Sequence, residues 1–210
     1  MKLPFSKLFV TGIDTGIGKT VASAIITKAL GASYWKPVQC GDLDQSDTQT
    51  VANLAKLKEN ELIAERYRLQ QASSPHAAAA NESLSISLES FKLPDREKIV
   101  VEGAGGTLVP LNHKHFVIDL IAHLSLPVVV VTKHYLGSLN HTFLTIEALK
   151  NRGIPILGLI FNGPEHPEYE AFIAEKTELP ILLNIKDHDQ LTPSLIAHYA
   201  KQFQENNSWT

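Results

Sequence analysis

The stretch Leu8–Thr20, LFVTGIDTGIGKT, decides how the rest of the chain is interpreted. It begins with the apolar run Leu8–Val10, which predicts a buried strand, and continues into the glycine-rich segment Thr11–Gly18. A Lys-Thr pair then opens the apolar run Val21–Leu30, which is long enough to form a helix. A strand, a glycine turn and a helix that starts with Lys-Thr together form the context of a phosphate-binding loop.

Such a loop binds anions mainly through its backbone. Successive N–H groups and the N-terminus of the helix form a cradle for phosphate groups. Gly12, Gly16 and Gly18 are expected to let the backbone approach those groups closely. We expect Lys19 to reach the β- and γ-phosphates and the Thr20 hydroxyl to ligate Mg²⁺.

The spacing of this loop departs from the common pattern. The usual first glycine would stand at Ile13, and Gly12 lies one position early. The alternative is a glycine-rich turn between a strand and a helix with an accidental Lys-Thr pair. The correctly placed strand and helix favour nucleotide binding.

Composition narrows the class of protein. The chain has 210 residues, enough for one α/β domain spanning 1–210, and its net charge of −3 gives no reason to expect a nucleic-acid partner. Cys40 is the single cysteine, which excludes an internal disulfide and a cysteine-rich zinc site. The N-terminus does not resemble a signal peptide, and no apolar run is long enough for a membrane span. We therefore expect a cytoplasmic protein without a membrane partner.

Strand-like and helix-like patterns alternate along the whole chain. The runs that predict strands are Leu8–Val10, Ser33–Val38, Lys98–Glu102, Pro127–Thr132, Ile156–Phe161 and Pro180–Ile185. The segments that predict helices are Val21–Leu30, Asp47–Leu57, His76–Ala80, Ser87–Leu93, Phe116–Leu124, Ser138–Lys150, Glu168–Lys176 and Thr192–Glu205. The alternation predicts a single α/β domain of the P-loop NTPase type, with a mostly parallel sheet and helices on both faces.

Ligands of such folds bind beyond the carboxyl ends of the strands, and three charged positions are expected there. Lys36 stands in an apolar strand, where it needs a negative partner unless the strand lies at the edge of the sheet in solvent. These two alternatives remain open at this point. The acidic segment Asp42–Asp47 has the composition of a solvated loop, yet one of its carboxylates could hold Mg²⁺. Glu102 is the better metal candidate, because it ends a buried strand and glycines follow it.

Several motifs together resemble one known family. They are Thr11–Thr20, Lys36–Val38, Ser46–Asp47, Ser74–His76, Val101–Gly106 and Leu136–His141. In this order and at these intervals they resemble dethiobiotin synthetases over most of the chain. The early glycine of the phosphate-binding loop is itself a feature of that family.

The resemblance implies an ATP- and Mg²⁺-dependent ring closure late in biotin synthesis. The substrates would be 7,8-diaminononanoate and CO₂ or bicarbonate. One amine takes up CO₂ as a carbamate, which attacks the γ-phosphate of ATP and gives a carbamic-phosphoric anhydride. The second amine then displaces phosphate and closes the ureido ring.

The resemblance also implies roles for individual residues. The Mg²⁺ ligands would be Thr20, Asp47 and Glu102, and the catalytic residues would be Lys36, Lys19 and Thr15. ATP would be bound by Gly12, Asp14, Thr15, Gly16, Ile17, Gly18, Lys19, Thr20 and, at adenine, Asn162. The substrate would be bound by Thr15, Lys36, Cys40, Gly137, Ser138, Leu139 and Asn140, with Gly137–Asn140 receiving its carboxylate across a homodimer interface.

Some positions depart from the family pattern. Cys40 stands where many relatives have serine, and Gly16 replaces a common glutamate. Leu183 and Lys186 replace a glycine and a proline near the base, so the nucleotide preference stays open with ATP as the default.

Two other protein classes have a similar first motif. Regulatory ATPases of the cell-division and plasmid-partition type carry an additional lysine at the position that Asp14 occupies here. Amidoligases of the cobyrinate type need a glutamine-handling domain, for which this sequence has no room. The regulatory ATPase remains the main alternative.

Overall fold

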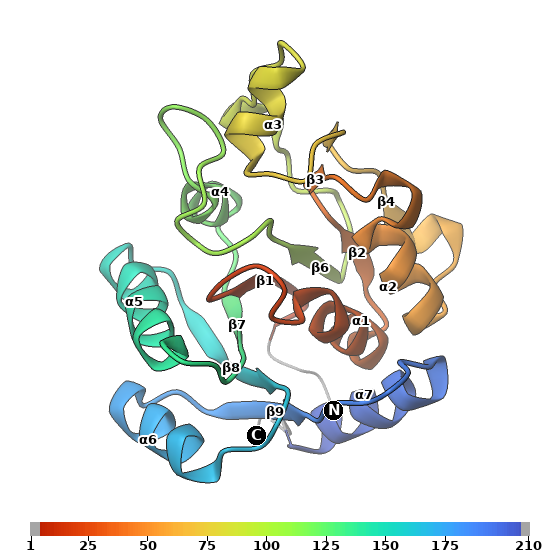
Figure 1. Ribbon diagram of the computed structural model, residues 1–210. Coiled ribbons are helices and arrows are strands. Elements are labelled where there is room, and N and C mark those ends of the chain that lie inside the picture. The colour runs from red at the N-terminus through yellow and green to blue at the C-terminus, as the bar shows by residue number, and fades with distance from the viewer. Residues whose placement is uncertain (1–4, 207–210) are drawn as a thin grey trace.

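The glycine-rich loop connects the first strand of the fold to its first helix. The computed structural model describes residues 5–206, in which β1 spans Lys7–Gly12 and α1 spans Lys19–Leu30. Figure 1 shows the loop at the end of β1, turning into α1. The predicted strand, turn and helix are therefore confirmed.

Seven strands of the described residues form one parallel sheet. They are β1, β2 (Ser33–Trp35), β4 (Leu62–Ile63), β6 (Ile99–Glu102), β7 (Val128–Thr132), β8 (Ile156–Asn162) and β9 (Ile181–Ile185). Their order is β4-β2-β6-β1-β7-β8-β9, and every pair is parallel. The central place of β6, between β2 and β1, brings the end of β6 next to the glycine-rich loop.

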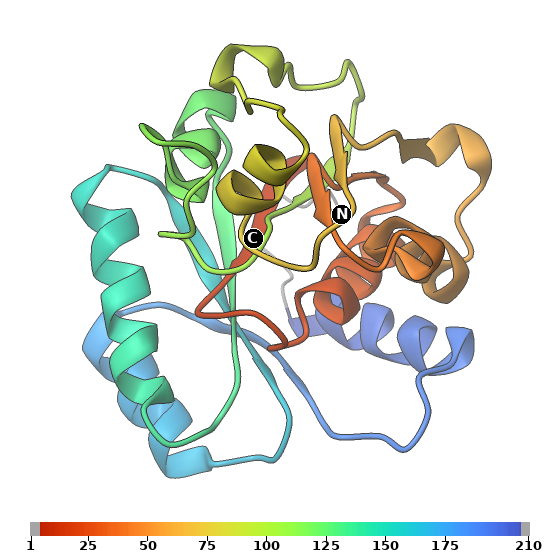
Figure 2. The ribbon, with the colours of Figure 1, turned by 45° about the horizontal axis from the view of Figure 1, so that its top comes forward.

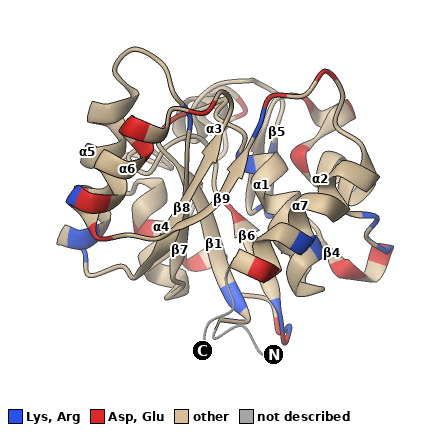
Figure 3. Cartoon of the chain, turned by 90° about the horizontal axis from the view of Figure 1, so that it is seen from below, with Lys and Arg blue, Asp and Glu red and all other residues tan. Residues whose placement is uncertain are grey.

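Helices cover both faces of this sheet. They are α1, α2 (Asp47–Ala55), α4 (Val117–Leu124), α5 (Ser138–Asn151), α6 (Pro167–Thr177) and α7 (Pro193–Asn206), whereas α3 (Pro75–Asn81) packs against strands outside this sheet. Figure 3 shows α1, α2 and α7 to one side of the strands and α4, α5 and α6 to the other. The predicted α/β architecture is therefore confirmed, and the helices begin and end within three residues of their predicted bounds.

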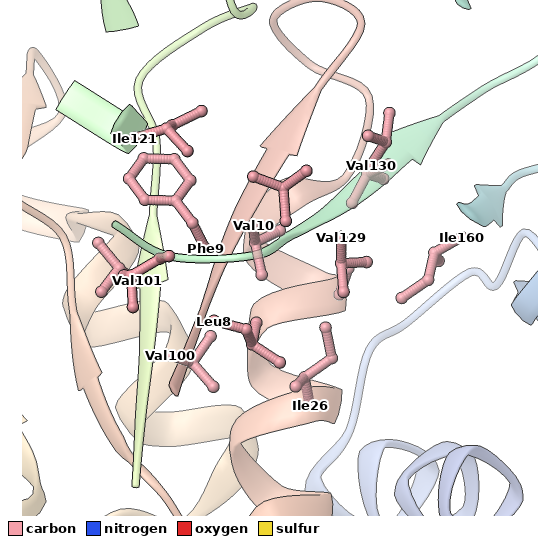
Figure 4. Packing of buried hydrophobic residues seen from close by; sticks show 14 of the residues in the cluster. Leu8, Phe9, Val10, Ile26, Val100, Val101, Ile121, Val129, Val130 and Ile160 are labelled. Carbon is pink, nitrogen blue, oxygen red and sulfur yellow. The ribbon is translucent and has the colours of Figure 1, made fainter. Parts of the chain in front are cut away.

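The core is packed on both faces of β1. Leu8, Phe9 and Val10 are buried, as expected for a parallel strand covered on both sides. In Figure 4 Phe9 points toward Ile121 of α4, whereas Leu8 lies on the side of Ile26 of α1. Adjacent residues of one strand thus bind the two helical layers to the sheet.

The predicted strand Ser33–Val38 is wrong in its extent. The structure divides it into β2 and β3 (Val38–Cys40), and β3 leaves the main sheet to pair with β5 (Tyr67–Leu69). Pro37 lies at the break, where it has no N–H to give to a sheet and its carbonyl accepts the N–H groups of Arg66 and Tyr67. We call the β3–β5 pair the ribbon; Figure 2 shows it in orange beside the yellow helix α3.

The predicted helix Ser87–Leu93 is also wrong. The structure has only the 3₁₀ turn η3 (Leu88–Ser90) there. Pro94 follows this segment and disfavours helical backbone in the residue before it. Two further 3₁₀ turns, η1 (Leu43–Gln45) and η2 (Glu59–Glu61), were not predicted.

The helices of residues 5–206 are all too short or too polar to cross a membrane.

Candidate active site

A cavity of about 700 Å³ lies at the carboxyl ends of β1, β2 and β6. It brings together residues predicted from separate motifs. These are Thr15, Gly16, Gly18, Lys19, Thr20, Lys36, Cys40, Asp47 and Glu102. Ala72–Pro75 and the ribbon residues Val38 and Gln39 also line it, so the ribbon forms one wall.

The glycine-rich loop is held by the protein's own side chains. Gly18 caps α1 with φ of 93°, a conformation that a side chain disfavours. A Cβ on Gly18 would collide with Asn162, whose Nδ2 donates a hydrogen bond to the Ile17 carbonyl at 3.0 Å. A Cβ on Gly12 would collide with Ile17. The folded loop therefore favours glycine at position 18, whereas a side chain at Gly12 would require Ile17 to move.

Lys19 is nearly buried at the start of α1. Its Nζ donates a hydrogen bond to the Asp14 carbonyl at 2.7 Å, across the loop. Burial, followed by the positive charge of Lys36, lowers the pKa of Lys19 to about 8, although three carboxylates oppose the shift. An anion in the loop would meet this ammonium group directly.

Glu102 is the centre of the polar network in the cavity. Its side chain is 1% exposed. Its Oε1 accepts hydrogen bonds from Thr20 Oγ1 at 3.1 Å and Lys36 Nζ at 2.9 Å. Its Oε2 accepts a hydrogen bond from the Tyr34 hydroxyl at 2.8 Å. Side chains from α1, from β2 and from the residue just after β2 therefore converge on one carboxylate.

Asp47 completes this network from the first turn of α2. Its Oδ1 accepts a hydrogen bond from Thr20 at 2.7 Å, and its Oδ2 lies 2.6 Å from Lys36 Nζ. The Ser46 side chain caps α2 and so fixes where Asp47 stands. The acidic segment thus places Asp47 beside Thr20 of the phosphate-binding loop, and Asp42 also lines the cavity.

The alternative of a solvent-exposed Lys36 is wrong, because Lys36 is 4% exposed. Burial alone would lower the pKa of Lys36, but the charges of Glu102 and Asp47 outweigh burial and raise it above its ordinary value. Burial would raise the pKa of Asp47, yet the neighbouring Lys36 lowers it below its ordinary value. The shifts in both pKa values favour the ionised pair of the Lys36 ammonium group and the Asp47 carboxylate.

The donor set fits Mg²⁺. Thr20 Oγ1 contacts both Asp47 and Glu102, so one hydroxyl and two carboxylates face the same space. Mg²⁺ is usually bound by one or two carboxylates together with water and substrate phosphates. Within residues 5–206 no group of three or more His, Cys, Asp or Glu side chains could hold a metal ion.

Gly137–Asn140 lies in another place. Gly137 caps α5, and Gly137, Ser138 and Leu139 line a second pocket of about 490 Å³ with His134, Tyr135, Leu136, His166 and Tyr169. These residues do not line the first cavity. Leu136 next to them has a relative exposure of 104%. The predicted carboxylate site and the first cavity are therefore lined by different residues of the chain.

Sequence reasoning missed Tyr34 and Gln39. Gln39 Oε1 accepts the backbone N–H of Asp47 at 3.3 Å and so supports the start of α2. Tyr34 had a usable signal, because it stands in a predicted strand two residues before Lys36. Gln39 had none, because the ribbon was not predicted.

Comparison with known proteins finds relatives that match almost the whole chain. A family model described as an AAA domain matches residues 6–194. The ATP-dependent dethiobiotin synthetase BioD of Christiangramia forsetii is 44% identical over 198 residues, which cover 94% of this chain and 95% of that protein. That of Cytophaga hutchinsonii is 44% identical over 202 residues, covering 95% and 98%. This chain belongs to the dethiobiotin synthetase family.

Solved structures place this family member in a wider fold group. A ParA family ATPase from Chlorobium tepidum has a TM-score of 0.56 and 15% identity, covering 94% of this chain and 99% of the other. The septum site-determining protein MinD of Pyrococcus horikoshii, in complex with Mg-ADP, has a TM-score of 0.54 and 13% identity, covering 95% and 89%. At such identities the likeness shows the P-loop NTPase fold alone.

The residues that depart from the dethiobiotin synthetase pattern lie in different surroundings. Cys40 lines the first cavity, and burial raises the pKa of its thiol to about 11. Leu183 is buried in β9, whereas Lys186 follows β9 and pairs with Glu165 at 3.0 Å on the surface. Gly16 has φ of 73°, with open space where a Cβ would stand.

Proposed function

We propose that this chain closes the ureido ring of dethiobiotin from 7,8-diaminononanoate and CO₂, with ATP converted to ADP and phosphate. The observation that carries the proposal is the buried Lys36 beside Asp47, Glu102 and the phosphate-binding loop. The names and high coverage of the relatives support the choice of substrates.

The reaction brings two anions together. The carbamate formed on one substrate amine attacks the γ-phosphorus of ATP, and ADP leaves. The second amine then attacks the carbonyl carbon of the carbamic-phosphoric anhydride, and phosphate leaves as the ring closes. The enzyme must lower the repulsion between carbamate and phosphoryl group in the first of these steps.

Two lysines divide this task in our proposal. Lys19 at the start of α1 binds the nucleotide phosphates, whose charge its ammonium neutralises. Lys36 stabilises the carbamate and the phosphoryl group in transfer, because it reaches the cavity from the carboxyl end of β2. Thr15 lies in the same cavity and contacts the diamine or its carbamate.

Thr20, Asp47 and Glu102 hold Mg²⁺ in this proposal. The bound ion supplies positive charge to the phosphate oxygens. Glu102 is kept in place by its contacts in the fold, and Asp47 by the start of α2. The ATP site is shaped by Gly12, Asp14, Gly16, Ile17 and Gly18. Asn162 lies beside adenine and supports the loop through its hydrogen bond to the Ile17 carbonyl.

We further propose a homodimer, in which Gly137–Asn140 of one copy receives the substrate carboxylate bound in the cavity of the other. The different lining of the two pockets supports this, as does the start of α5, where no side chain caps the helix. Because the reaction consumes ATP for biosynthesis, we assign it to the cytoplasm.

The test is a coupled assay of phosphate release with ATP, Mg²⁺, bicarbonate and 7,8-diaminononanoate. Phosphate release is expected to need all four components, and product mass is expected to match dethiobiotin. Lys19→Gln serves as the inactive control. Phosphate release that does not depend on the diamine would instead indicate a regulatory ATPase and overturn the proposal.

A further inference from the structure

Tyr34 has a position in the fold that the proposed reaction leaves unexplained. It lies in β2 opposite Val100 of β6 and is 0% exposed. Side chains alternate along a strand, so Val100 and Glu102 share one face, and Tyr34 points to that same face. Its long ring spans the diagonal to Glu102, where the hydroxyl donates its hydrogen bond to Oε2 at 2.8 Å.

This contact makes the two oxygens of Glu102 different. Oε2 is engaged by Tyr34, while Oε1 faces Thr20 Oγ1 and Lys36 Nζ. The terminal torsion of a glutamate is broad, so a carboxylate without such a donor samples many orientations. A hydrogen bond to a charged acceptor is strong, which suits it to fix the orientation.

We propose that Tyr34 is a positioning residue that orients Glu102 for Mg²⁺·nucleotide by holding Oε2 and leaving Oε1 toward Thr20. The inference rests on the proposed function only in taking Glu102 as a metal ligand. Partners that hydrogen-bond a metal-binding carboxylate commonly contribute a factor of about 10 to 100 in metal affinity. The competing explanation is that Tyr34 only fills space in the core.

Tyr34→Phe separates these explanations, because it keeps the ring and removes the hydroxyl. Tyr67→Phe is the matched control, since its hydroxyl contacts Ser90 and the backbone of Ser87 and lies outside the cavity. The probe is AMPPNP, titrated by calorimetry at a series of Mg²⁺ concentrations and without Mg²⁺. No diamine is present, so the result does not depend on ring closure.

Tyr34→Phe is expected to raise the Mg²⁺ concentration for half-maximal AMPPNP binding about tenfold. Binding without Mg²⁺ is expected to stay within about twofold of the parent, as is all binding by Tyr67→Phe. In a Glu102→Gln background Tyr34→Phe is expected to add no further effect. An unchanged Mg²⁺ requirement, or equal losses with and without Mg²⁺, would overturn the role of Tyr34. A parent protein without any Mg²⁺ requirement would instead contradict the metal site itself.

A measurement on the unaltered chain covers the case in which Tyr34→Phe does not fold. Fluorine NMR of protein labelled with 3-fluorotyrosine reports on each of the 5 tyrosines. The Tyr34 signal is identified by replacing each of the others. It is expected to shift when Mg²⁺ is added to the AMPPNP complex, and a Tyr34 signal that does not respond would overturn the proposal.

Discussion

The two halves of the sheet edge are built differently. At the carboxyl ends of β2 and β6, the side chains of Lys36, Glu102 and Tyr34 are buried, and both Lys36 and Tyr34 donate hydrogen bonds to Glu102. Beyond β7 and β8, Gly137 is exposed and Leu136 lies entirely in solvent. The first half is assembled within one chain, whereas the second presents an apolar residue and a helix start to the outside.

The contrast between the buried, paired half and the exposed half indicates which part of the proposed reaction one chain can perform alone. Charges that are already paired in the fold need little reorganisation when phosphoryl transfer begins. Tyr135, Leu136 and Tyr169 are all exposed around the second pocket. Such a cluster of exposed apolar side chains is typical of a surface that another protein covers. We therefore expect nucleotide chemistry to depend on the first half and diamine recognition to depend on assembly through the second.

The largest effect is expected at Lys36. Lys36→Gln should lower diamine-dependent phosphate release by about 100- to 1,000-fold, because it removes the charge between the two reacting anions. Lys36→Arg should fail similarly, because a planar guanidinium does not replace a compact ammonium group. Calorimetry should show far weaker nucleotide binding in Lys19→Gln than in either Lys36 variant.

The Lys36 variants also probe stability. Lys36 neutralises two carboxylates, so thermal melting of Lys36→Gln without Mg²⁺ should occur several degrees below the parent. A Lys36→Gln protein that closes the ring at close to the parent rate would make Lys36 a structural lysine.

The next effect is expected at Glu102. Glu102→Gln keeps the shape of the side chain and removes its charge, so phosphate release should fall about 100-fold. The protein should still melt cooperatively, at a temperature lowered less than in Lys36→Gln, because Lys36 keeps Asp47 as a partner. Glu170→Gln is the control from the other half, because Glu170 is also buried but contacts His134 and Asn184. Glu170→Gln should leave the Mg²⁺ requirement unchanged. Near-normal turnover of Glu102→Gln would remove Glu102 from the metal site.

A moderate effect is expected at Leu136. Leu136→Asp should weaken the dimer and raise KM for the diamine about tenfold, with nucleotide affinity unchanged, because a charge is costly in an apolar contact. Leu84→Asp alters another exposed leucine and should change neither. Light scattering and sedimentation measure assembly. A monomer that is fully active at high dilution would contradict the comparison of the two halves.

The smallest effect is expected at Cys40. With a thiol pKa of about 11, Cys40 is protonated at neutral pH, and alkylation should speed up about tenfold per pH unit between pH 7 and 10. Cys40→Ser should change turnover by less than about threefold, since both side chains are small and uncharged at pH 7. Rapid alkylation at pH 7, followed by mass spectrometry, would show that the wall of the cavity is more polar than its burial indicates.

The sequence predicted the order of the major elements because their signals are local. Glycines between an apolar strand and helix indicate the phosphate-binding loop, and runs such as Val128–Thr132 indicate strands regardless of context. The order of strands in the sheet is not local. Nothing in the pattern of Ile99–Glu102 states that β6 lies between β1 and β2.

The candidate site was predictable in its residue types and less so in its contacts. Lys36 could equally have been exposed, and only the position of Glu102 across the sheet decides that it is buried. Asn162 donates a hydrogen bond to the carbonyl of Ile17, which lies 145 positions earlier in the sequence. Three-residue strands such as β3 and β5 carry too little pattern to be recognised, so the ribbon wall and Gln39 were missed.

The insertion of β6 between two strands that precede it also governs how the protein is made. Thr20, Tyr34 and Lys36 stand 82, 68 and 66 residues before Glu102, their shared partner. A growing polypeptide therefore holds β1 and β2 without their common neighbour until residue 102 has left the ribosome. Such long-range pairing is slow to form, so nucleotide affinity should emerge in a late phase of refolding, after most helical signal has returned. ATP binding during refolding would therefore report the time at which the central sheet is complete.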